Sequence, residues 1–74
     1  MEINQWQAVV YSLIRIGWIV VQSKAGTWLT KPRSRQNRVI VSSRTLDLFV
    51  RNGILEKKSD NGDVVIYAKP SLNL

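Results

Sequence analysis

The sequence predicts a single α+β domain in which two helices are each followed by a β-hairpin, with a basic loop between the two halves. Three observations support this fold class: an amphipathic pattern in each predicted helix, glycines where the helices should end, and β-branched runs separated by turn residues. The chain has 74 residues, enough for one domain but only a small core. A homodimer interface or a bound partner would therefore add stability.

The first half reads as a helix followed by a hairpin. The strand that follows the helix is Trp18 to Val21, Lys24-Ala25-Gly26 forms the turn, and Thr27 to Thr30 returns until Pro32 ends it. The helix should end near Gly17, and one stripe of it is apolar. The members of that stripe are Ile3, Trp6, Val10, Leu13, Ile14 and Gly17.

The second half repeats this order. Val39 to Val41 is short and β-like, Ser42-Ser43 offers an N-cap, and Gly53 stands where a left-handed C-cap belongs. Asn61-Gly62 between two strand-like runs predicts a type I′ hairpin. The runs are Ile54 to Lys58 and Val64 to Lys69, and the expected core includes Trp6, Val10, Leu13, Leu46, Phe49, Val50 and Ile54.

Composition excludes several functions. The chain has no cysteine and no histidine, so disulfides, Cys/His zinc sites and thiol or imidazole catalysis are ruled out. The acids are few and scattered, without a catalytic, metal-binding or phosphate-loop arrangement. We expect no enzyme activity and no cofactor, and a cytoplasmic location.

The most apolar stretch, Ala8 to Val21, is too short for a membrane span. It has fourteen residues and contains Arg15, whereas a span needs about 20 residues with few charges. A signal peptide would carry basic residues ahead of such a run, but the N-terminus carries Glu2 and no basic side chain. We expect no membrane association.

The net charge of +6 is regional. Residues 3–46 contain seven cations and no acid, whereas residues 47–74 contain four of each. A one-sided positive field attracts polyanions, which makes nucleic acid the first partner to consider. The densest segment is "KPRSRQNR", Lys31 to Arg38, and it leaves three interpretations open: phosphate contacts, a solvated loop, or contacts with an acidic protein.

The segment Val41 to Pro70, "VSSRTLDLFVRNGILEKKSDNGDVVIYAKP", resembles the C-terminal half of a winged helix-turn-helix domain. In that family an N-capped recognition helix ends in a glycine before an Ile-Leu strand, and the next hairpin is the wing. The resemblance implies binding to double-stranded DNA, with Ser42 to Asn52 as recognition helix and Lys57 to Val64 as wing tip. The fold expected is thus a compact winged-helix-like domain.

The first half departs from the family pattern. A standard winged helix has a second helix just before the recognition helix, but here Pro32 and three consecutive β-branched residues disfavour one. We therefore expect a variant with two hairpins and two helices. Because the basic loop directly precedes the recognition helix, we expect its cations near the same phosphate backbone. The expected nucleic-acid-binding residues are Lys31, Arg33, Arg35, Arg38, Ser43, Arg44, Arg51, Lys57 and Lys58.

Individual side chains allow alternatives. Arg44 and Arg51 could contact base edges or phosphates, or Asp47 could hold both, because it stands three and four residues away from them. Leu48 falls among the charged side chains of the helical wheel, so we expect it to be exposed and to meet a thymine methyl or a protein partner.

The tryptophans are expected mainly in the core, with base stacking, as in single-strand binders, the minor alternative. The leading hypothesis is a small, dimeric DNA-binding regulator or accessory factor. The alternative is an inhibitor or adaptor, of the phage or mobile-element kind, that binds a host protein with its winged-helix surface.

Overall fold

The structure, a computed structural model, describes residues 2–33 and 37–71, which form two helices and one five-stranded antiparallel sheet. The order confirms the α+β class, with one strand more than the two expected hairpins supply. The elements are α1 (Gln5–Arg15), β1 (Ile19–Ser23), β2 (Gly26–Thr30), β3 (Arg38–Ile40), α2 (Ser43–Arg51), β4 (Glu56–Asp60) and β5 (Val64–Ala68).

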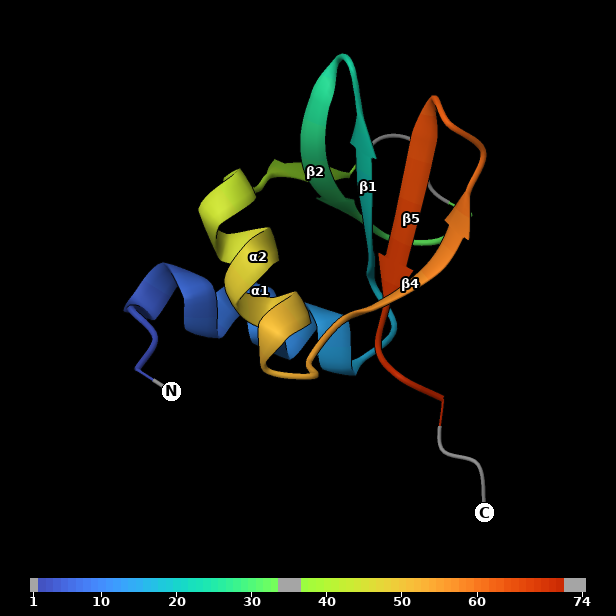
Figure 1. Ribbon diagram of the computed structural model, residues 1–74. Coiled ribbons are helices and arrows are strands. Elements are labelled where there is room, and N and C mark those ends of the chain that lie inside the picture. Colours follow the sequence, from blue (N-terminus) through green and yellow to red (C-terminus); the bar gives the residue numbers. More distant parts are fainter. Residues whose placement is uncertain (1, 34–36, 72–74) are drawn as a thin grey trace.

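The sheet has the strand order β3-β2-β1-β5-β4, so the two hairpins join through β1 and β5 (Figure 1). In this central pair Val20 lies opposite Tyr67 and Val21 opposite Ile66. The predicted β-like run at Val39 to Val41 is realised as β3, which pairs with β2. In the part described between β2 and α2 the regular element is thus a strand, which agrees with the expected departure from a standard winged helix.

Local signals set the helix ends. Asn4 and Gln7 form a reciprocal capping box at the start of α1, and the Ser42 hydroxyl accepts the Thr45 N–H at the start of α2. Gly53 has φ 73°, and the Ile54 N–H donates back to the Phe49 carbonyl at 2.9 Å. This is a Schellman motif, and α1 ends in the same way at Gly17.

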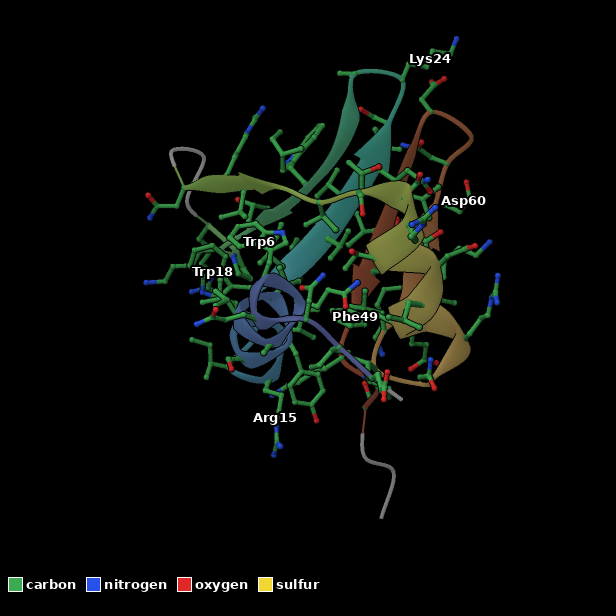
Figure 2. All side chains as sticks on the ribbon, turned by 90° about the vertical axis from the view of Figure 1, so that its left-hand side faces the viewer. Trp6, Arg15, Trp18, Lys24, Phe49 and Asp60 are labelled. Carbon is green, nitrogen blue, oxygen red and sulfur yellow. The ribbon has the colours of Figure 1, made fainter. Side chains whose placement is uncertain are left out.

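The core lies between the helices and one face of the sheet, and both helices cover that face (Figure 1). Phe49 is fully buried, and its ring meets that of Tyr11 edge to face, with centroids 6.4 Å apart. Figure 2 shows Phe49 between α1 and α2. The buried apolar residues are Val10, Ile14, Val20, Leu29, Val41, Leu46, Phe49 and Leu55.

The prediction of the core is wrong for two residues, which the structure places at the surface. Trp6 is 50% exposed and Val50 is 39% exposed. Each helix is rotated relative to the expected face, because α1 has apolar residues on adjacent stripes and α2 buries Thr45. The Thr45 hydroxyl oxygen accepts from Gln7 at 3.2 Å and from Ser42 at 3.0 Å, so its burial leaves no unsatisfied polar atom.

The turn between β4 and β5 differs in type from the expected one. The turn at Asn61-Gly62 is not type I′, which requires positive φ at both residues; outside glycine, positive φ among the described residues occurs at Arg33, not Asn61. Instead the Asn61 side chain accepts the Val64 N–H at 2.8 Å.

Among the described residues, neither helix is long and apolar enough to cross a membrane.

Candidate nucleic-acid interface

The first candidate surface, called the helix surface here, consists of Ser43, Arg44, Arg51, Lys57 and Lys58. All five residues lie at the surface, although the side chain of Lys58 is only 31% accessible. Beside them a surface hollow of about 530 Å³ separates α2 from the core-facing side of the sheet, and Arg44 and Tyr67 both contribute to its wall. Tyr67 also packs against the core.

Most cations of the helix surface are paired with acids. Arg51 meets Asp47 at 3.4 Å, Lys57 meets Asp60 at 3.5 Å and Lys58 meets Glu56 at 3.1 Å. Arg44, by contrast, forms no ion pair among the described residues. Of the two arginines that Asp47 was expected to hold in one interpretation, it therefore holds Arg51 and not Arg44. The helix surface is therefore nearly neutral.

The turn of the wing, residues 60–63, carries two acids and no basic side chain, whereas Lys57 and Lys58 lie behind it in β4. The Asp60 carboxylate accepts the Gly62 N–H at 3.0 Å, and this hydrogen bond, with help from Lys57, lowers the pKa of Asp60 below its ordinary value of 3.8. Asp63 lies beside it in the turn. Two carboxylates at the tip would repel phosphates, which opposes a wing that enters a groove of DNA.

Leu48 does not lie where the sequence pattern placed it. Its side chain is half-buried and packs against the core, so the expectation of a substantially exposed contact residue is wrong. The rotation of α2 that exposes Val50 turns Leu48 inward. A part of Leu48 still lines a small hollow of about 140 Å³ with Arg44, Asp47 and Arg51.

The second candidate surface, called the basic hollow, lies at the end of β2 and the start of β3. It has a volume of about 500 Å³, and Lys31, Arg33 and Arg38 stand around Trp28 in its lining. All three cations are exposed, and none forms an ion pair with an acid among the described residues. Arg35 lies outside the described residues.

Trp28 and Arg38 make the most specific contact of the basic hollow. The Arg38 guanidinium carbon stands 4.8 Å from the centre of the Trp28 ring, a cation–π geometry. Arg33 has φ 70°, a left-handed conformation that costs a non-glycine residue about 1 kcal/mol or more. Backbone strain of this kind is concentrated at functional sites.

The α2 part of the helix surface and the basic hollow lie on opposite faces of the sheet. Successive side chains of a strand alternate between faces, and Leu29 points into the core, so Trp28 points away from the helices. Trp28 is half-buried and lies outside the core cluster, which corrects the expectation of a core tryptophan; Trp18 does pack against the core. The start of β3 and α2 are also separated along the sheet, at the left and the right of Figure 2.

This separation changes the expectation for the basic loop. Its described cations are not beside α2, although they precede it closely in sequence. The cause is β3, whose extended backbone carries the chain from Arg38 along the edge of the sheet before Ser43 begins α2. The aromatic–basic combination could have been suspected from Trp28 and the flanking cations, but their placement on one face required the strand pairing.

Comparison with protein-family models, with curated proteins and with solved structures finds no match for this chain. Within the described part of the chain, no three Asp or Glu side chains gather in a way that could hold a metal ion.

Proposed function

We propose that this protein binds nucleic acid and that its basic segment, Lys31 to Arg38, supplies most of the phosphate contacts. The observation that carries this proposal is the difference between the two surfaces: the cations of the helix surface are largely paired with acids, whereas those of the basic hollow have none beside them. Unpaired, exposed cations that neutralise phosphates release the counterions condensed on the nucleic acid, and this release favours binding.

The ligand that the winged-helix resemblance implies is double-stranded DNA, and the biological role would be that of a regulator or accessory factor. In this proposal the basic segment contacts a duplex through its phosphates alone. Arg44 on α2 faces the other side of the sheet; because it is exposed and has no acid partner among the described residues, it is available to contact a base edge of a second DNA segment. A bidentate contact to guanine discriminates against other bases by roughly 1–3 kcal/mol.

Two triple variants test the division of labour. Arg33, Arg35 and Arg38 are replaced by alanine in one, and Arg51, Lys57 and Lys58 in the other, so that both lose three positive charges. Binding to random duplex DNA is measured across a salt series. Each lost phosphate contact flattens the slope of log affinity against log salt by about 0.9, so the first variant should lose nearly three units.

The second variant should change the slope far less, because its cations already have acid partners. Equal slopes for wild type and the first variant would refute the proposal. A larger effect in the second variant would assign the phosphate contacts to the helix surface instead.

A protein partner is the second candidate function. The observation that favours it is the mixed character of α2, where the partly exposed Val50 lies among alternating charges at Arg44, Asp47 and Arg51. Such a surface suits a protein better than a phosphate backbone. Wild-type protein that ignores duplex DNA at about 50 mM salt but binds an acidic polypeptide would favour this alternative.

A further inference from the structure

The outer face of the sheet, the one turned away from both helices, carries a continuous apolar strip. Its cross-strand neighbours are Ile40 on β3, Trp28 on β2, Val21 on β1 and Ile66 on β5, each directly opposite the next. Ile40 is 75% exposed and the other three are half-buried. Within the described structure no helix covers this face, as Figure 1 shows.

The basic hollow occupies one end of this strip and combines a planar surface with positive charge. The guanidinium carbon of the exposed Arg38 lies 4.8 Å over the centre of the half-buried Trp28 ring, so two planar groups stand together at this point. Nucleobases stack on aromatic rings and on arginine planes alike, and such stacking tolerates any base.

The charges around the hollow select an anionic occupant. Lys31 and Arg33 stand at the rim, and no acidic side chain lines the hollow. An acidic peptide would satisfy these cations but would leave the apolar Trp28 strip without a partner. A single nucleic-acid strand supplies both groups at adjacent positions, because each base is attached to a phosphate. In duplex DNA the bases are already stacked on one another and unavailable to a side chain on an open sheet.

We propose that the basic hollow binds unpaired nucleotides of single-stranded nucleic acid. The base lies against the Arg38–Trp28 pair, while Lys31 and Arg33 hold the flanking phosphates. This inference rests on the proposed function, since it requires that the protein bind nucleic acid, and adds that its ligand contains an unpaired strand. The exposed side of α2, on the other face of the sheet, remains free for duplex DNA.

A comparison of two oligomers separates base stacking from charge. Affinities of wild type, Trp28→Ala and Trp6→Ala are measured by fluorescence anisotropy for a labelled oligothymidine and for an abasic strand of equal length and charge. Wild type should prefer the oligothymidine by about 5- to 150-fold, the range expected for one stacked base. The preference should fall to within about twofold in Trp28→Ala and persist in Trp6→Ala, which alters an exposed tryptophan on α1.

A second measurement does not depend on how well Trp28→Ala folds. In the variant Trp6→Phe/Trp18→Phe, Trp28 is the single tryptophan, and its fluorescence should be quenched by oligothymidine but only weakly by the abasic strand. Trp28→Phe, which keeps an aromatic ring, should retain part of the preference for bases.

The possible failures are distinct. Equal binding of both strands by wild type, or an undiminished preference in Trp28→Ala, overturns the stacking site and leaves the proposed function standing. Absence of binding to any strand or duplex at low salt overturns both proposals. Quenching of Trp28 by poly-glutamate as strong as that by oligothymidine overturns the stacking site in favour of an acidic protein.

Discussion

Replacing Phe49 by alanine tests the packing of α2 more directly than any other single change. The ring is fully buried, contacts Tyr11 edge to face, and lies where α1, α2 and the sheet meet. Truncating a buried phenylalanine costs about 3–5 kcal/mol, from lost apolar burial and from the cavity left behind. A chain of 74 residues has a free energy of unfolding of roughly 4–11 kcal/mol, so the variant should be close to unfolding.

The assay is thermal unfolding followed by circular dichroism, together with urea unfolding followed by tryptophan fluorescence. For a domain of this size, about 1 kcal/mol corresponds to roughly 4–8 °C, so Phe49→Ala should lower Tm by about 12–40 °C. Phe49→Leu, which conserves most of the volume, should cost less than about 1.5 kcal/mol.

Val50→Ala provides the matched control, because it shortens the neighbouring residue on the exposed side of the same helix. Its effect should stay within about 0.5 kcal/mol. If Phe49→Ala left Tm unchanged, or if Val50→Ala cost more than Phe49→Ala, the rotation of α2 described above would be refuted.

Four further predictions concern single side chains. Ser42→Ala removes the cap of α2 and should cost about 1 kcal/mol in urea unfolding, whereas Ser43→Ala, one residue later, should cost much less. Arg33→Gly relieves the left-handed backbone and should not lower Tm, although it weakens binding to nucleic acid; a marked drop in Tm would contradict the strained conformation. Leu48→Glu should destabilise the fold, because that side chain packs against the core, and an unchanged Tm would restore Leu48 as a surface residue. The pKa of Asp60 is depressed in the folded state, so the contribution of its carboxylate to stability is present above pH 3.8 and is lost as the pH falls through the lower pKa of the folded protein. The Tm of Asp60→Asn should therefore depend less on pH in this acidic range than the Tm of wild type.

The helix ends could be predicted from the sequence because caps are local. Ser42 and Gly53 act within a few residues of their own positions, and the backbone carries their signal directly. Which face of each helix is buried was harder to predict. In α1 the apolar residues Trp6, Val9 and Ile16 form a second stripe beside the buried one, and periodicity alone does not choose between neighbouring stripes.

The candidate site was predictable in its parts but not in its arrangement. The charge of the basic segment is visible in the sequence, as is the period of two that separates Trp28 from Leu29. Which of the two enters the core depends on how β2 pairs with β1 and where the helices pack, and no local signal specifies this. The acid partners of Lys57 and Lys58 are within three residues of them and were accessible to sequence reasoning.

The central pairing of β1 with β5 has a consequence for how the chain is made. During synthesis β1 and β2 emerge early, but the second neighbour of β1 is the last strand of the sheet to appear. Until residues 64–68 leave the ribosome, the backbone N–H and C=O groups on one edge of β1 have no strand partner, and the domain cannot close from its first half alone. The same dependence runs in reverse. A fragment restricted to residues 41–70 would contain both α2 and the β4–β5 hairpin, yet β5 would lose the strand that flanks it, so this half of the chain is not separable from residues 19–23.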